Sequence, residues 1–177
     1  MAFDSDIELV AAARAGSDAA FARLVAKHQG VVRGFLRRVL GGDWAEADDV
    51  AQEVFLTAWT SLRSLNDAAG VRPWLCGIAW RKARDGMRGR RRAEARDATW
   101  LDLSERPPGV SPEDRMAMEA AMANLAPDER ACVALCLAEG WSHGEAATAL
   151  GLPLGTVKSH VGRGRAKLLQ ALGGSDG

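Results

Sequence analysis

The chain has 177 residues, of which 47% are hydrophobic and 26% are charged, a composition typical of folded proteins and not of disordered ones. Its 23 lysine and arginine residues balance 23 aspartate and glutamate residues, so that the formal net charge is zero. The longest apolar run, residues 131–138, is far shorter than the roughly 20 residues that span a bilayer. Acidic residues occupy the amino terminus, where a secretion signal would carry basic ones. We therefore expect a cytoplasmic protein without membrane insertion.

Charge is sorted along the chain although its sum is zero. Residues 68–92 contain 8 basic residues and one acid, Asp85, whereas residues 93–129 contain 9 acids and 3 basic residues. Residues 156–172 carry basic residues and no acid. Such segregation concerns the partners of a protein rather than its fold. Helix faces that are merely exposed to solvent would give the same pattern. Because the basic residues are grouped, however, a net charge of zero does not exclude a nucleic-acid-binding protein.

Helical signals begin at the amino terminus. Ser5-Asp6-Ile7-Glu8 is a capping box, and Ser17 is placed to cap the next helix. Apolar residues then recur at three-and-four spacing over residues 21–40, which predicts a long amphipathic helix that Gly41-Gly42 ends. His28 lies on the apolar stripe of this helix, and we expect it to be packed and hydrogen-bonded.

Two further helices and a linker follow. A third helix is predicted over about residues 45–65, with one apolar face and one largely acidic face. A loop leads to Arg72-Pro73 and to a fourth helix, about 73–92, which ends in a cluster of arginines. Residues 93–111 lack periodicity and contain Pro107-Pro108-Gly109, which indicates a flexible linker. Ser111-Pro112 then begins a new helix. The sequence thus predicts an all-α protein of two small helical domains, residues 1–92 and 112–177, joined by the linker 93–111.

The second domain contains a predicted helix-turn-helix. Ser142-His143-Gly144-Glu145 is another capping box, which begins a short alanine-rich helix. Gly151-Leu152-Pro153 turns the chain into a second helix of about residues 155–172, with Val157 and Val161 facing inward. In DNA-binding proteins of this kind the second helix enters the major groove. An αα-hairpin that binds no nucleic acid would share much of the pattern, but the acid-free outer surface favours DNA.

Three motifs resemble those of bacterial sigma factors. Residues 46–59, EADDVAQEVFLTAW, resemble the acidic core-binding helix of that family. Residues 72–81, RPWLCGIAWR, look like the promoter-melting helix that comes next, and residues 155–159, GTVKS, resemble the second DNA-binding domain. The short chain and the order of the motifs match the extracytoplasmic-function (ECF) group over about residues 5–172. The resemblance implies a subunit that binds core RNA polymerase and directs promoter-specific transcription initiation, and that an anti-sigma factor commonly holds inactive.

The resemblance also implies three sets of site residues. Charge, hydrogen bonds and one apolar contact to the β′ coiled coil of the polymerase would come from Asp48, Asp49, Gln52, Glu53 and Leu56. In the −10 element, aromatic planes stack on exposed bases while cations hold phosphates. The residues implied there are Trp74, Trp80, Arg81, Lys82, Arg84 and Arg88, with Asn66 and Asp67 forming a pocket for a flipped base. The −35 element would be read by Thr156, Lys158, Ser159, His160, Gly162 and Arg163.

Some of these positions depart from the family pattern. Cys76-Gly77 stand where many relatives carry Tyr-Arg, and Arg81 lies near a position that is often asparagine. In the recognition helix, Gly162 replaces a bulkier residue and His160 stands where arginine is usual. We therefore expect Lys158 and Ser159 to carry more of the −35 readout.

Two other interpretations are open from the residues alone. A free-standing LuxR-like regulator would also contain a helix-turn-helix, but it leaves the acidic motif at residues 46–59 unexplained. A helical enzyme or metal sensor would use His28, His143, His160 and the cysteines, which lack the spacing of metal ligands. We accordingly expect no catalytic residue, no metal and no cofactor. Cys76, Cys132 and Cys136 are expected to be reduced thiols, with Cys132 and Cys136 acting as small buried hydrophobes.

Overall fold

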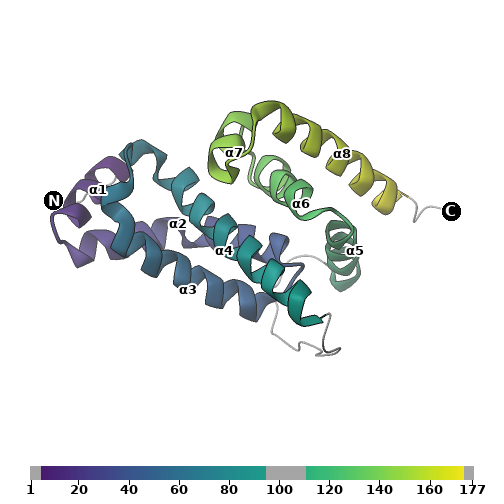
Figure 1. Cartoon of the computed structure of the whole chain (residues 1–177), viewed down its shortest axis with the longest axis horizontal. Helices are drawn as coiled ribbons and strands as arrows, with labels where there is room; N and C mark the ends of the chain where they lie inside the picture. Colours follow the sequence, from purple (N-terminus) through teal and green to yellow (C-terminus); the bar gives the residue numbers. More distant parts are fainter. Residues whose placement is uncertain (1–4, 95–110, 174–177) are drawn as a thin grey trace.

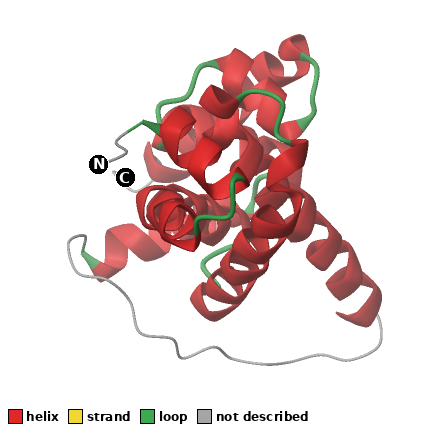
Figure 2. Ribbon diagram, turned by 90° about the vertical axis from the view of Figure 1, so that its left-hand side faces the viewer, coloured by secondary structure: helices red, strands yellow, loops and turns green. Residues whose placement is uncertain are grey.

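The computed structural model describes residues 5–94 and 111–173, which form two groups of helices that lie side by side (Figure 1). The amino-terminal unit contains α1 (Asp6–Arg14), α2 (Asp18–Val39), α3 (Trp44–Ser61), the 3-10 turns η1 (Leu62–Ser64) and η2 (Ala68–Gly70), and α4 (Val71–Glu94). The carboxy-terminal unit contains α5 (Pro112–Ala123), α6 (Pro127–Val133), the π-helical turn η3 (Ala134–Ala138), α7 (His143–Leu150) and α8 (Leu154–Gly173). The described residues include no strand (Figure 2), and the predicted all-α fold is confirmed.

Side-chain caps begin the helices at the residues that the sequence predicts. Ser5 and Ser142 each close a capping box with the glutamate three residues later. Ser17 and Ser111 also accept a hydrogen bond from a backbone N–H of the first turn. These oxygens satisfy donors that have no partner inside the helix. The local starting points of four helices are therefore encoded within four residues each.

Two predicted boundaries differ from the observed ones. The apolar stripe of the third helix extends to Leu65, but α3 ends at Ser61 and the chain tightens into the 3-10 turn η1. Leu62 and Leu65 are still buried, so that the apolar pattern continues where the α-helical hydrogen bonds do not. The next helix, α4, begins at Val71, and Pro73 lies in its first turn, where the missing N–H of proline removes no helical hydrogen bond.

In the amino-terminal unit, α2 packs against α1, α3 and α4. Phe35, Leu36 and Val39 on α2 are completely buried. His28 is buried as expected, with its Nε2 atom 3.1 Å from Oδ1 of Asp6. Partial burial raises the pKa of Asp6, but hydrogen bonds with Lys27 and His28 outweigh it and hold that pKa below its ordinary value. This polar contact ties the start of α1 to the middle of α2.

In the carboxy-terminal unit, α5 and α6 pack against α8, and α7 and α8 form the predicted helix-turn-helix. Gly151 ends α7 with a φ of 64°, a left-handed conformation that glycine adopts without strain. Val157 and Val161 are buried on the inner face of α8, as predicted. Gly164 lies where a Cβ atom would come within 2.5 Å of Cγ2 of Val133. Only glycine permits this close approach of α8 to α6.

The two units also contact each other. Helix α4 packs along α7, and α2 packs against α6 and η3. Buried apolar side chains of both units belong to one continuous cluster. The outer faces of α3 and α8 remain uncovered, and most of the candidate site residues lie there.

Candidate functional site

The exposed side of α3 carries most of the predicted polymerase-binding residues. Asp43 caps the helix by accepting a hydrogen bond from the backbone N–H of Glu46. Four small apolar residues of α3 face the core and are completely buried: Ala47, Ala51, Val54 and Ala58. On the other side, the structure leaves four of the five predicted residues exposed: Asp49, Gln52, Glu53 and Leu56. Helical periodicity alone thus brings these side chains to one surface.

Asp48, the fifth predicted residue, is only partly exposed and has partners on α2. Its Oδ1 atom lies 3.3 Å from Arg37 and 3.8 Å from Arg33. The Arg37 guanidinium in turn stacks over the ring of Trp44, 3.8 Å from the centroid. Asp48 therefore fixes the packing of α2 against α3 in addition to any contact with a partner.

A groove between α2 and α3 adjoins this exposed face. It has a volume of about 370 Å³ and is lined by Phe21, Val25, Gln29, Arg33, Gln52, Phe55, Leu56 and Trp59. Leu56 is 68% exposed and Trp59 is 40% exposed, although both are large apolar residues. The Trp59 ring packs on Phe21 with a centroid separation of 4.7 Å. Clustered exposed apolar side chains with a polar margin are typical of a protein-binding surface.

Sequence reasoning did not assign a role to the α2 side of this groove. Phe21, Val25 and Gln29 belong to the long amphipathic helix, whose apolar stripe predicts burial for the first two. The stripe is broader than the core that covers it, so its edge remains accessible in the groove. Trp59 is the last residue of the acidic motif at residues 46–59. An aromatic side chain close to acidic ones is the feature of the sequence that points to this groove.

The predicted −10 residues lie on α4 and in the turn before it. Asn66 and Asp67 are exposed, and Asp67 accepts a hydrogen bond of 2.9 Å from the N–H of Ala69. Arg81 and Arg88 are exposed on α4, and three further predicted residues are partly exposed there: Trp74, Lys82 and Arg84. Lys82 also contacts Glu53 of α3 at 3.5 Å. Basic side chains thus follow α4 over several turns.

Trp80 departs from the sequence expectation of an accessible aromatic plane. It is only 1% exposed, because α4 is covered by the core of its own unit on one side and by α7 on another. Its predicted stacking on a base requires an arrangement in which α4 is uncovered. Core packing is an alternative that the sequence leaves open for Trp80, but the helix that covers α4 lies far along the chain and no local pattern identifies it.

The predicted −35 residues follow the outer face of α8. Lys158, Ser159, Gly162 and Arg163 are exposed, and Thr156 and His160 are partly exposed. Among the described residues, nothing beyond the adjoining residues and the backbone of α8 itself lies within 4 Å of the position of a Cβ at Gly162, so the surface is open there. This exposed row begins in the first turn of α8 and has the helical spacing of a recognition helix.

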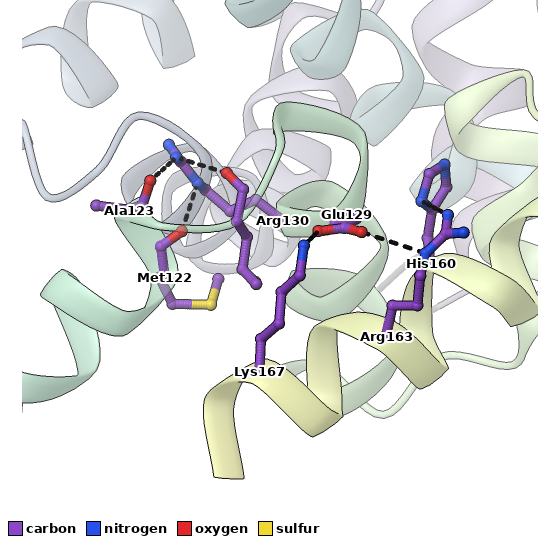
Figure 3. A network of polar contacts seen from close by, with 8 residues as sticks. Met122, Ala123, Glu129, Arg130, His160, Arg163 and Lys167 are labelled. Carbon is purple, nitrogen blue, oxygen red and sulfur yellow. Dashed lines mark hydrogen bonds and ion pairs between the residues drawn. The ribbon is translucent and has the colours of Figure 1, made fainter. Parts of the chain in front are cut away.

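A buried carboxylate anchors the same helix (Figure 3). Glu129 of α6, whose side chain is 7% exposed, contacts Lys167 at 2.7 Å and Arg163 at 3.3 Å. Arg163 also lies 3.1 Å from Nδ1 of His160. The hydrogen bond from Lys167 holds the pKa of Glu129 below its ordinary value, and partial burial opposes this only in part. Glu129 thus orients one predicted DNA-contacting residue, and through it a second.

The neighbouring Arg130 closes the turn between α5 and α6 (Figure 3). Its guanidinium donates hydrogen bonds to the carbonyl oxygens of Met122, Ala123 and Leu125. It also donates to the carbonyl oxygen of Val39 on α2 at 2.9 Å. Sequence reasoning identified neither Glu129 nor Arg130, because 38 residues separate Glu129 from Lys167 and no local pattern joins them.

The cysteines are free thiols in the structure. Burial raises the pKa values of Cys76 and Cys132 to about 12. Within residues 5–94 and 111–173, no group of three or more His, Cys, Asp or Glu side chains is arranged to hold a metal ion. Over the same residues, no helix is both long and apolar enough to cross a membrane.

Comparison with known proteins accounts for both helical units. Residues 24–93 match sigma-70 region 2, and residues 115–168 match sigma-70 region 4. The chain belongs to the sigma-70 family. This sigma factor is 34% identical to the RNA polymerase sigma factor CarQ of Myxococcus xanthus, over 90% of this chain and 93% of that protein. It is 33% identical to the ECF RNA polymerase sigma factor SigL of Mycobacterium tuberculosis, over 86% of this chain and 88% of that one.

Solved structures agree with this assignment. CnrH in complex with the cytosolic domain of CnrY has a TM-score of 0.74 to this sigma factor and 32% sequence identity, with 98% of this chain and 100% of that chain covered. RpoE of Bartonella quintana, in complex with the anti-sigma factor NepR, has a TM-score of 0.75 and 26% identity, with 86% and 96% covered. The resemblance to ECF sigma factors is therefore confirmed, and the protein directs promoter-specific transcription initiation. The match to region 2 disfavours the LuxR-like alternative.

Proposed function

We propose that the exposed face of α3 and the adjoining groove bind the β′ coiled coil of core RNA polymerase. The observation that carries this proposal is the exposure of Leu56 and Trp59 beside the acidic side chains of Asp49 and Glu53. A coiled coil presents apolar and charged side chains along its length. Leu56 and Trp59 fit its apolar positions in the groove, while Asp49, Gln52 and Glu53 pair with polar or basic ones. Asp48 supports this face from within, through Arg37 and Arg33.

The promoter-binding roles follow the two basic helices. We assign the −10 element to the turn with Asn66 and Asp67 and to the α4 residues Trp74, Trp80, Arg81, Lys82, Arg84 and Arg88. We assign the −35 element to the α8 residues Thr156, Lys158, Ser159, His160, Gly162 and Arg163. The α4 cations suit the phosphates of an opened strand, and the α8 row suits a major groove. Lys158 and Ser159 are exposed on the outer face of α8, where their side chains are accessible for contact with bases.

The remaining assignments concern organisation and partners. We propose residues 1–92 as the polymerase and −10 domain and residues 112–177 as the −35 domain, with the linker 93–111 between them; residues 95–110 of that linker lie outside the described residues. Because the polymerase performs the chemistry, the chain then needs no catalytic residue. We also propose that the chain acts in the cytoplasm. Two structural relatives are described in complex with CnrY and with the anti-sigma factor NepR, and we propose an inhibitor of this kind for the present chain.

In vitro transcription with purified core polymerase, followed by mapping of the start sites, tests the proposal. The chain should support initiation at specific promoters when core enzyme is added, and it should bind the same promoters weakly alone. Tight and specific footprinting without core enzyme would instead support a free-standing regulator.

Charge reversal tests the polymerase-binding face. Asp49→Arg with Glu53→Arg should abolish or strongly weaken binding to core polymerase while the far-UV circular dichroism spectrum is preserved, because both side chains point away from the core of the bundle. Glu113→Arg on α5 is the matched control, since it reverses an exposed carboxylate in the other unit. Unchanged core binding of the double variant would refute the docking assignment.

A further inference from the structure

Helix α1 packs against the turn that carries Asn66 and Asp67. It contacts both η1 and η2, the 3-10 turns before and after these two residues. The inner face of α1 is apolar, with Leu9 and Val10 at most 2% exposed. The match to sigma-70 region 2 begins only at residue 24, so that α1 lies outside it. A helix beyond the matched region therefore forms part of the surroundings of the proposed −10 pocket.

Arg14, the last residue of α1, reaches this turn with its side chain. Its Nε atom donates a hydrogen bond of 3.3 Å to the carbonyl oxygen of Leu62, and its Nη2 atom donates to the carbonyl oxygen of Leu65. A guanidinium holds its donors in a rigid planar fork, so a single side chain can fix two carbonyl groups relative to each other. Because the donor is charged, each of these bonds is stronger than one between neutral groups. Arg14 consequently holds both ends of η1.

The carbonyl oxygen of Leu65 belongs to the peptide bond that joins Leu65 to Asn66. Because a peptide bond is planar, a fixed oxygen also orients the N and Cα atoms of Asn66. The Leu65 side chain is buried and anchors the near side of this plane. Beyond it, Asp67 accepts a hydrogen bond of 2.9 Å from the N–H of Ala69, and its carbonyl oxygen accepts one of 3.0 Å from Gly70. The backbone is therefore held before and after Asn66 and Asp67, while their side chains stay exposed.

The position of Arg14 also suits the end of α3. Leu62 is the C-cap of that helix, and the last carbonyl groups of a helix have no partner inside it and carry a partial negative charge. Residues 58–61, the last turn of α3, contain no lysine or arginine. Arg14 is half-buried and brings a cation to this helix end from α1. The contact is thus supported both by hydrogen bonds and by charge.

We propose that Arg14 is a positioning residue for the −10 element: its guanidinium orients the Leu65–Asn66 peptide and thereby the pocket that Asn66 and Asp67 offer to an unpaired base. This inference rests on the proposed function of these two residues. Hydrogen bonds to a base weaken steeply when distance or angle departs from the favoured geometry, so a tilt of the peptide misplaces both side chains together. Arg14 touches no DNA and acts only through the backbone. Helix α1 is thereby part of the promoter-reading surface although its residues contact no base.

Arg14→Lys tests the proposal, because lysine keeps the positive charge and loses the planar fork. Arg63→Lys is the matched control, since it makes the same exchange on η1, where the side chain is exposed. Each variant is combined with core polymerase. Fluorescence anisotropy then measures the binding of a labelled non-template-strand oligonucleotide, which carries the −10 element of a promoter identified by the start-site mapping described above. A second set of oligonucleotides carries an abasic site at each −10 position in turn.

Arg14→Lys should bind the complete oligonucleotide at least about fivefold more weakly than the original protein does, whereas the oligonucleotide that lacks the flipped base should bind equally to both. Arg63→Lys should behave like the original protein. In a background of Asn66→Ala with Asp67→Ala, Arg14→Lys should have little further effect, since the pocket that it positions is already lost. An unchanged penalty for the missing base in Arg14→Lys, or an undiminished effect in the alanine background, overturns the inference.

The variant with Asn66→Ala and Asp67→Ala separates this inference from the proposed function. If that variant discriminates against the abasic oligonucleotides as the original protein does, the turn binds no base, and its proposed function fails together with the inference. If the variant loses this discrimination while Arg14→Lys keeps it, the proposed function stands and only the inference fails.

Hydrogen exchange of the free protein examines the turn without DNA. Arg14→Lys should speed the exchange of the backbone amides of residues 65–70 several-fold and leave those of α2 and α4 at their original rates. Exchange of residues 65–70 at the original rate would contradict the hold of Arg14 on this backbone. Faster exchange throughout the amino-terminal unit would assign Arg14 to general stability and would also overturn its positioning role.

Discussion

Gly164 offers a quantitative test of how the recognition helix is seated. Replacing it by alanine places a Cβ atom 2.5 Å from Cγ2 of Val133, well inside van der Waals contact. Val133 is 3% exposed and β-branched, so that its methyl group has little freedom to move away. Overpacking of this kind costs about 1–3 kcal/mol, whereas alanine gains about 1 kcal/mol over glycine in a helix interior. The net change in the free energy of unfolding is the difference between these two effects.

Gly162→Ala isolates the steric cost. It lies two residues earlier on the same helix, in open space, and gains the same helix propensity without a clash. We therefore expect Gly164→Ala to be about 1–3 kcal/mol less stable than Gly162→Ala. Urea unfolding followed by far-UV circular dichroism measures both values, provided that the transitions are two-state and have equal slopes.

Val133→Ala supplies the second half of the experiment. Because it removes the clashing methyl group, Gly164→Ala should be less destabilising in the Val133→Ala background than in the original protein. The resulting coupling energy belongs to this pair of residues. If Gly164→Ala and Gly162→Ala were equally stable, or if the coupling were zero, the close approach of α8 to α6 would be refuted as a constraint on the fold.

Three further predictions concern other parts of the molecule. Ser142→Ala should lower the free energy of unfolding by about 1 kcal/mol through loss of the α7 cap, measured by thermal unfolding, and an unchanged Tm would contradict the role of the cap. The pKa of Glu129 in the folded protein lies below its ordinary value of 4.5. The ion pairs of Glu129 therefore stabilise the fold at pH values above 4.5, and this stabilisation is lost as the pH falls through the folded pKa. Glu129→Gln should therefore be less stable at neutral pH, with a deficit that shrinks in acid; urea titrations at several pH values check this, and a constant deficit argues against it. Trp59→Ala should weaken binding to core polymerase by about 1–2 kcal/mol with unchanged helicity, measured by competition with unmodified protein, and equal affinity would remove Trp59 from the interface.

The sequence by itself determined the helices and their polar and apolar faces. Capping by Ser5, Ser17, Ser111 and Ser142 was predictable because each serine bonds a backbone N–H within three residues. The exposed acids of α3 and the outer row of α8 were predictable for a similar reason, since helical periodicity assigns each side chain to a face. The family resemblance also followed from motifs that are continuous in the chain.

Only the tertiary structure decided which faces meet. The groove beside Trp59 depends on the width of the gap between α2 and α3, and the contact of Glu129 with Arg163 depends on the approach of α6 to α8 at Gly164. The burial of Trp80 depends on α7, which is more than sixty residues away along the chain. A helical pattern states that a face is apolar or cationic, but it does not state what covers that face. In this sigma factor Trp80 is the clearest case, because the periodicity of α4 does not reveal that α7 packs against that helix.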